Sequence, residues 1–228
     1  MKGALKVLFM LVSSAAVYAD SNDIYITQSG TGLTLTIDQI GDGNVVGTSQ
    51  TRATFTGTSM TVDVDQVGDS NTLAASIAQG NSTSFTVTST GDSNQTTLAF
   101  GASGDVANTD FDLIETGDSN VVSFVQGADA TATAGNQDIT ITGTSNNINA
   151  TCEVVGCINN WTVDGDANDI DTSQTGNADH QITASITGNT NNIDIDQTNS
   201  TGSTSGIAVI IATTSNGTID IDQCTSGC

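Results

Sequence analysis

The chain repeats a short Gly-Asp-x-Asn signature, and no other feature limits its possible folds so strongly. Glycine tolerates positive φ, and Asp and Asn bond their own backbone, so each copy predicts a turn. Successive copies lie 22 to 27 residues apart, a period that is typical of solenoids. The copies occupy residues 41–44, 68–71, 91–94, 117–120, 143–146, 165–168 and 188–191, with a degenerate copy at 214–217.

Apolar and polar residues alternate on both sides of each turn, which predicts strands with one buried face. The position four residues before the turn glycine is occupied by Ile37, Val64, Val87, Leu113, Ile139, Trp161, Ala184 and Ile210. The position two residues earlier is mostly apolar, with Gln137 and Asn159 as polar exceptions. The residues between these positions are mainly Thr, Ser and Asp, as an outward face requires.

Each unit therefore predicts the order strand, turn, strand, turn. A single unit cannot bury its apolar face, but stacked units can, with equivalent residues about 4.8 Å apart. We expect an all-β fold, a two-sheet parallel β-solenoid of about eight strand-turn-strand coils. This solenoid forms one repetitive domain over residues 20–228.

The first 19 residues have the pattern of a signal peptide. Lys2 and Lys6 precede an apolar core at 7–12, and Val17-Tyr18-Ala19 fits the small-residue cleavage site. This apolar run is too short to span a membrane, and no longer one follows. We therefore expect a secreted, extracellular protein without a transmembrane segment.

Removal of this leader leaves Arg52 as the one strong positive charge against 25 acids. Such a chain is not expected to bind nucleic acid electrostatically. In-register stacking aligns acids in two columns, Asp42, Asp69, Asp92 and Asp118 at the turns, and Asp171, Asp194 and Asp220 on a strand. These columns predict either binding of Ca²⁺ or other hard cations, or solvated carboxylates with counterions. No metal site is certain, and no other cofactor is expected.

Two sets of amides are predicted to form ladders inside the stack. Buried amides are costly unless they bond, and stacked amides bond the equivalent residue in the next coil. The turn asparagines are Asn44, Asn71, Asn94, Asn120, Asn168 and Asn191. The inward glutamines are Gln28, Gln39, Gln50, Gln66, Gln126, Gln174, Gln197 and Gln223. The column that begins with Gln39 and Gln66 continues through Ser89 and Glu115.

These positions resemble the curlin repeat, in which Gln, four residues, Asn, five residues and Gln follow one another. Gln39, Asn44 and Gln50 match the whole pattern, and other units match half of it. The resemblance implies a secreted subunit of curli fibres, the functional amyloids that make up adhesive fimbriae in biofilms. It also implies self-association, a nucleator subunit and an outer-membrane secretion channel as partners.

Four cysteines in an exported chain favour disulfides. Short spacing favours Cys152–Cys157 and Cys224–Cys228, although other pairings, a metal site and bridges between subunits stay open. His180, the single histidine, lies beside a turn and is expected to be solvated. The sequence contains no nucleophile motif or phosphate-binding loop, so we expect no enzyme.

Two functions follow from these patterns. The first is a structural subunit that assembles with copies of itself at its open first and last coils. The alternative is a monomeric exported solenoid that binds a ligand, cation or ice with one face, as an adhesin or ice-binding protein does. Outward threonines support the alternative, namely Thr36, Thr88, Thr90, Thr140, Thr142 and Thr162.

Overall fold

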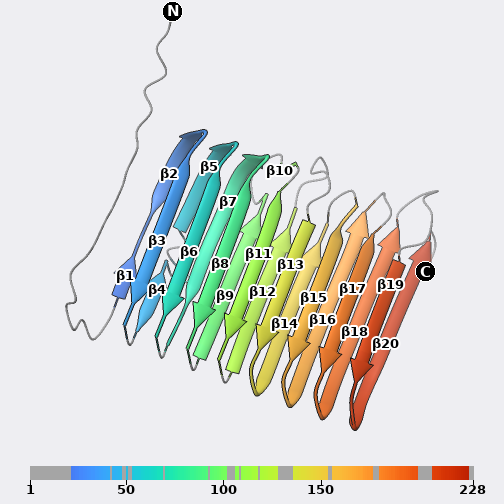
Figure 1. Cartoon of the computed structure of the whole chain (residues 1–228). Coiled ribbons are helices and arrows are strands. Elements are labelled where there is room, and N and C mark those ends of the chain that lie inside the picture. Colours follow the sequence, from blue (N-terminus) through green and yellow to red (C-terminus); the bar gives the residue numbers. More distant parts are fainter. Residues whose placement is uncertain are drawn as a thin grey trace, which may run out of the picture.

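The chain folds into a two-sheet parallel β-solenoid, as the repeat predicts (Figure 1). The computed structural model describes residues 22–41, 43–47, 50, 53–68, 70–91, 93–101, 106–107, 109–117, 119–127, 136–153, 156–176, 180–199 and 207–225. The predicted signal peptide, residues 1–19, lies outside the described residues.

The two sheets differ in size. Sheet B has eight strands in the order β19 (Ile207–Thr213), β17 (Gln181–Thr187), β15 (Ile158–Asp164), β13 (Asn136–Thr142), β11 (Asp110–Thr116), β8 (Ser84–Thr90), β6 (Thr61–Val67) and β3 (Thr34–Ile40). Sheet A has twelve strands, and nine form its main path: β1 (Asn22–Ile24), β4 (Asn44–Val46), β7 (Leu73–Asn81), β9 (Ser93–Phe100), β12 (Ser119–Gln126), β14 (Ser145–Cys152), β16 (Ala167–Gly176), β18 (Thr190–Asn199) and β20 (Asn216–Thr225). Strands β2 (Thr27–Thr31), β5 (Ala53–Thr58) and β10 (Val106–Ala107) pair beside this path.

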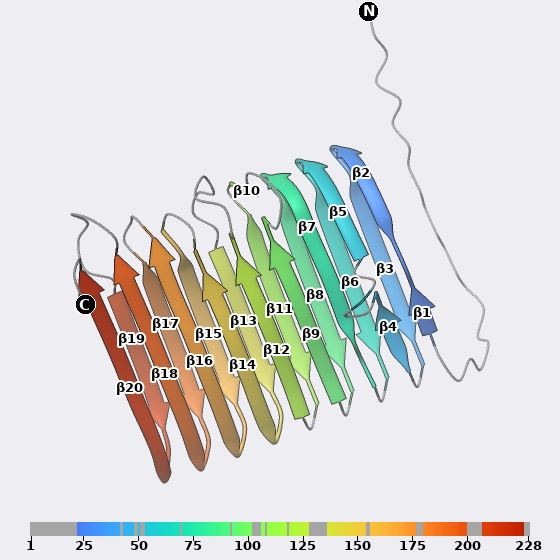
Figure 2. The same ribbon diagram turned by 180° about the vertical axis from the view of Figure 1, so that it is seen from behind.

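Consecutive coils stack in register, and every strand pair in the structure is parallel (Figures 1 and 2). Asn146, Asn168 and Asn191 are successive partners in sheet A. The turns are bonded between coils too, because the Gly68 N–H donates to the Thr90 carbonyl at 2.9 Å. The signature therefore returns to the same place in each coil.

Close stacking explains why glycine opens each turn signature. A Cβ added to Gly68 would overlap the carbonyl oxygen of Gly41 in the preceding coil. The same overlap occurs at Gly91 with Gly68, and at Gly117 with Gly91. The turns of neighbouring coils therefore approach more closely than any side chain allows.

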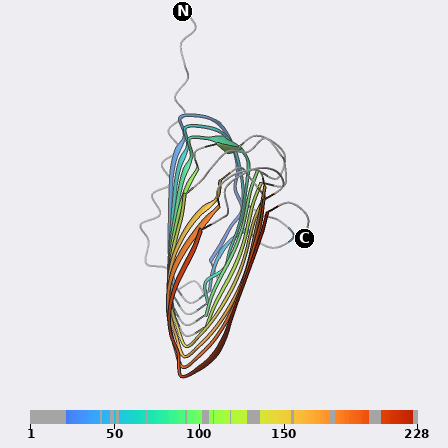
Figure 3. The same ribbon diagram turned by 90° about the vertical axis from the view of Figure 1, so that its right-hand side faces the viewer.

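The core lies between the two sheets, which meet in a narrow edge at the glycine turns (Figure 3). Inward positions hold aliphatic residues in most coils and a cluster of phenylalanines in the first half of the stack. Phe111 and Phe124 stack face to face with their ring centroids 5.3 Å apart. The cluster also contains Phe55, Phe85 and Phe100.

Candidate functional site

The turn asparagines are buried and bond from coil to coil. In the first coils Asn71 donates to the Asn44 Oδ1 at 2.6 Å, and Asn94 donates to Asn71. In the later coils the amides donate in the opposite direction, toward the C-terminal end. Asn120 donates to Asn146 at 2.9 Å, a residue that the predicted ladder omitted.

The asparagine ladder continues from Asn146 to Asn168 at 2.7 Å and from Asn168 to Asn191 at 2.8 Å. The direction of hydrogen-bond donation changes between Asn94 and Asn120, which are register partners in β9 and β12. Their buried Oδ1 atoms have no hydrogen-bond partner. The ladder therefore consists of two segments of opposite polarity.

The first glutamine ladder is short and belongs to sheet B. Gln66 donates to the Gln39 Oε1 at 2.9 Å, and both side chains are buried. Each amide also bonds a backbone carbonyl across the core, Gln39 to Val45 and Gln66 to Thr72, both at 3.1 Å. These bonds tie sheet B to sheet A beside the turn.

The second glutamine ladder lies in sheet A at the C-terminal end. Gln197 donates to Gln174 at 2.7 Å, and Gln223 donates to Gln197 at 2.6 Å. Gln126 occupies the same column, but Cys152 separates it from Gln174. The two ladders therefore occupy different sheets at opposite ends of the molecule.

Three predicted ladder residues, Gln28, Gln50 and Gln126, have no register pairing with another glutamine in the described strands, and Gln126 pairs with Phe100 and Cys152 instead. Gln50 is exposed and lies between β4, which ends at Val46, and β5, which begins at Ala53, so it belongs to neither strand. Gln28 is half-buried in β2, where its partner in the next coil is Phe55. Counting from the turn misplaced Gln50 because this stretch is not one continuous strand.

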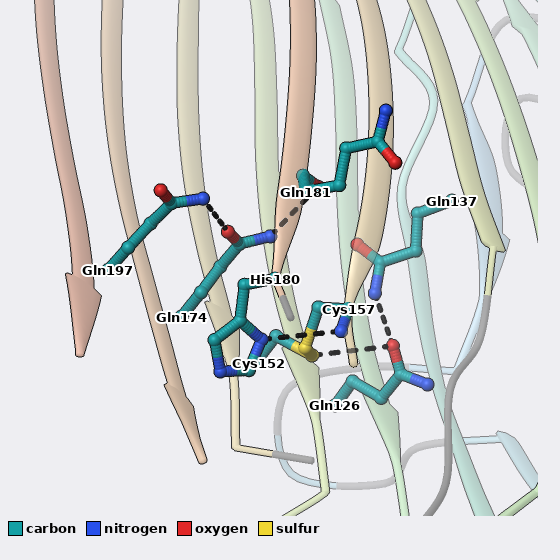
Figure 4. The surroundings of a disulfide bond; sticks show 8 residues. All are labelled: Gln126, Gln137, Cys152, Cys157, Gln174, His180, Gln181 and Gln197. Atoms are coloured by element: carbon teal, nitrogen blue, oxygen red, sulfur yellow. Dashed lines mark hydrogen bonds between the residues drawn. A yellow bond between two sulfur atoms is a disulfide. The ribbon is translucent and has the colours of Figure 1, made fainter. Parts of the chain in front are cut away.

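A buried polar cluster surrounds the predicted disulfide between Cys152 and Cys157, which is present (Figure 4). The Gln137 amide donates to the Gln126 Oε1, so this polar exception in the apolar column is bonded. His180 is fully buried rather than solvated, and its Nδ1 accepts the Cys157 N–H at 3.3 Å.

The second predicted disulfide joins Cys224 to Cys228. Cys224 is disulfide-bonded, but Cys228 lies outside the described residues. No free cysteine is found in the part of the chain that the structure describes. Cys152, Cys157 and Cys224 are therefore not available as thiolate ligands for a metal.

Glu115 is a buried acid. Its spacing places it in the polar column of Gln39, Gln66 and Ser89, but the sequence did not predict that its carboxyl group would be buried. It is fully buried and accepts a hydrogen bond from the Thr96 hydroxyl through Oε1. Its Oε2 has no hydrogen-bond partner. Burial raises the pKa of Glu115 to about 7, against the opposing effect of the Thr96 hydrogen bond.

The strand column of acids is formed as predicted, on the outer face of sheet A. Asp171, Asp194 and Asp220 are successive partners in β16, β18 and β20, and Asp196 adjoins Asp222 beside them. Lost hydration and then the neighbouring carboxylates raise the pKa of Asp194. No group of three His, Cys, Asp or Glu suited to a metal ion occurs among the described residues. The turn column of Asp42, Asp69, Asp92 and Asp118 lies outside them.

The C-terminal end of the stack exposes core positions. Ile193 and Ile195 of β18 are each 1% exposed, whereas their partners in β20, Ile219 and Ile221, are 48% and 38% exposed. Among the residues that the structure describes, sheet B has no strand beyond β19 to cover them. At the other end, the inward side chains of the first coil, such as Leu35, are also only half-buried.

The comparisons with known proteins found no matching family model, no matching curated protein and no matching solved structure. Within the described ranges, no helix has the length and apolar character needed to cross a membrane.

Proposed function

We propose that this chain is a secreted structural subunit that stacks end to end with copies of itself into an extracellular adhesive fibre of the curli type. The observation that supports it most is the exposed end of the core at β20. Ile219 and Ile221 continue columns that are buried one coil earlier. A further coil from another copy would bury them at about 25 cal/mol for each Å² of apolar surface.

Three further features support self-assembly over a soluble monomer. The edge strands at the ends of both sheets have backbone groups that can pair with another chain. The amide ladders inside the coils are of the kind that stabilises cross-β stacks. The curlin-like spacing of Gln39 and Asn44 corresponds to buried, bonded amides.

Assembly of the mature chain, residues 20–228, tests the proposal. Denaturant is removed with and without Ca²⁺, and the product is examined by electron microscopy and fibre diffraction. We expect fibres with a meridional reflection at about 4.8 Å. A β-rich species that stays monomeric at high protein and salt concentrations contradicts the proposal.

A matched pair of variants tests the role of the exposed end. Ile221→Asp places a charge on the inward face of β20, whereas Thr218→Asp adds the same charge on its outer face. We expect Ile221→Asp to abolish fibre growth and Thr218→Asp to retain it. Equal growth of the two variants would show that the core end is not the assembly surface.

The alternative of a monomeric binding module has one specific observation in its favour. A groove of 640 Å³ follows the turns from Thr116 to Ser215 and crosses several coils. Its lining repeats Thr, Gly and Asp along the stack, as at Thr142, Gly143 and Asp164, which suits an extended polar ligand. A stable monomer in the assembly test would favour this function.

A further inference from the structure

The two sheets end unevenly, and this limits how copies can stack. The main path of sheet A has nine strands, whereas sheet B has eight. The first described strand, β1, and the last, β20, both belong to sheet A, so β20 extends half a coil beyond β19 (Figures 1 and 2). The next strand layer in the winding order belongs on the side of sheet B.

Simple translation of a second copy along the stack does not supply that layer. Its sheet A would pair with β20, and its first sheet B strand, β3, would lie two layers from β19. A gap one strand wide would remain opposite Ile219 and Ile221. Such a gap forfeits the packing that a buried isoleucine needs.

Rotation of the second copy by half a turn about the stack axis removes the gap. Its β1 and β2 then lie beside β19, and its β3 lies beside β20. Within one subunit the strands of sheet A and those of sheet B run in opposite directions, since the chain reverses at each turn. The half-turn inverts every strand direction of the second copy, so its sheet A strands run the same way as sheet B of the first copy. Both new pairs are therefore parallel, like every pair within the subunit.

The inward side chains of the two strands brought together by this rotation match one by one. β20 carries Ile219-Asp220-Ile221-Asp222-Gln223, and β3 carries Leu35-Thr36-Ile37-Asp38-Gln39. In this register each apolar residue adjoins an apolar residue, and Gln223 adjoins Gln39. The C-terminal ladder of Gln174, Gln197 and Gln223 would then continue through Gln39 and Gln66 of the next copy.

The ladder also explains why the two glutamine columns occupy different sheets. Gln39 and Gln66 lie in sheet B at the start of the stack, and Gln174 to Gln223 lie in sheet A at its end. A half-turn at the junction brings the two columns onto one line.

We propose that successive subunits stack head to tail with a half-turn about the fibre axis, so that β20 of one copy pairs with β3 of the next and Gln223 adjoins Gln39. This inference rests on the proposed function, because it specifies the junction within the fibre. Its subunit repeat is eight and a half coils, a rise of about 41 Å at a coil spacing of about 4.8 Å.

Charge reversal across the junction tests this register. The half-turn places Asp222 beside Asp38 of the next copy on the outer face, whereas within one subunit these residues lie at opposite ends of the stack. Asp222→Lys or Asp38→Lys alone then creates an attractive pair at every junction, and the double variant restores repulsion. Simple translation places Asp222 beside Thr27, so the two substitutions act independently.

The measurement is the critical concentration for fibre formation at low salt. We expect each single variant to lower the critical concentration. The critical concentration of the double variant should be about threefold or more above the value expected if the two single effects added. The pair Asp222→Lys and Asp112→Lys is the control, since Asp112 lies in β11 in mid-stack, and it should be additive. Fibres in which Asp222 and Asp38 also act additively would overturn the half-turn, while absence of fibres would overturn the proposed function as well.

Helical reconstruction of the wild-type fibre provides a second readout that needs no variant. The half-turn predicts alternate subunits in opposite orientation about the axis, with the rise of about 41 Å. Subunits in one orientation with a rise of about 43 Å, which corresponds to nine coils, would overturn the inference.

Discussion

The first coils and the last coils obey the same repeat but differ in regularity. β4 and β7 share a single residue pair, whereas β16 with β18 and β18 with β20 share ten pairs each. The turn glycines of the first unit, Gly41 and Gly68, lie 27 positions apart, and β4 ends at Val46 whereas β5 begins only at Ala53. The 22- and 23-residue units near the C-terminus form unbroken strands instead. Unit length alone does not decide whether the coil is continuous, because the 26-residue unit from Gly188 to Thr214 also contains an unbroken strand, β18.

The largest expected difference between the two regions concerns glycine. A Cβ on Gly188, in the regular region, would overlap the Gly165 carbonyl and meet the Asn191 Oδ1 at 2.7 Å. A Cβ on Gly30, in β2 of the first coil, would meet nothing within 4 Å. We expect Gly188→Ala to lower the free energy of unfolding by about 3 kcal/mol or more. Gly30→Ala is the control and should be neutral, as measured by denaturant unfolding.

The second prediction concerns Glu115, which lies between the two regions. Its folded pKa, about 7, exceeds its ordinary value of 4.5, so the folded state binds the proton more tightly than the unfolded state. Its contribution to stability is therefore intact below pH 4.5 and is lost as the pH rises through about 7, at a cost of about 3 kcal/mol.

Unfolding of Glu115→Gln and the wild-type chain at pH 5 and pH 8 measures this effect. We expect the variant to lose less stability than the wild type over this interval. An identical pH dependence in both proteins would show that the carboxyl of Glu115 does not remain buried and protonated.

The third prediction concerns the disulfide at the start of the regular region. Replacement of both Cys152 and Cys157 by alanine should lower the free energy of unfolding by about 2 kcal/mol, because the cross-link closes a short loop. Amide hydrogen exchange should accelerate in β14 and β15. If β5 and β7 respond as strongly, the two regions form one cooperative unit rather than two.

The smallest effect separates a bonded glutamine from an unstacked one. Gln197→Leu removes the amide that donates to Gln174 and leaves the buried Oε1 of Gln174 without this hydrogen bond. The free energy of unfolding should fall by about 1 to 2 kcal/mol. Gln28→Leu in the first coil should change stability by less than about 0.5 kcal/mol. Similar losses of stability for both variants would show that stacking on another glutamine does not stabilise Gln197 more than its position in the first coil stabilises Gln28.

Periodicity was sufficient to predict the two sheets, the parallel register and most of the inward columns, because one face of every strand must be buried. It misplaced Gln50, since a count from the turn assumes an unbroken strand. The buried state of His180 was missed because its neighbours in sequence are mostly polar, and its contact with Cys157 in the preceding coil joins residues that are distant in sequence. The direction of the amide ladders depends on the orientation of each side chain, which no residue spacing encodes.

The unequal pairing of the coils also has a mechanical consequence. Force applied along the stack acts along the hydrogen bonds between strands, so all bonds of one coil carry the load together. Ten residue pairs share that load between β18 and β20, whereas seven pairs share it where β4 and β5 meet β7. Under tension the molecule should yield first in its N-terminal coils, and these would extend while the C-terminal coils stay intact.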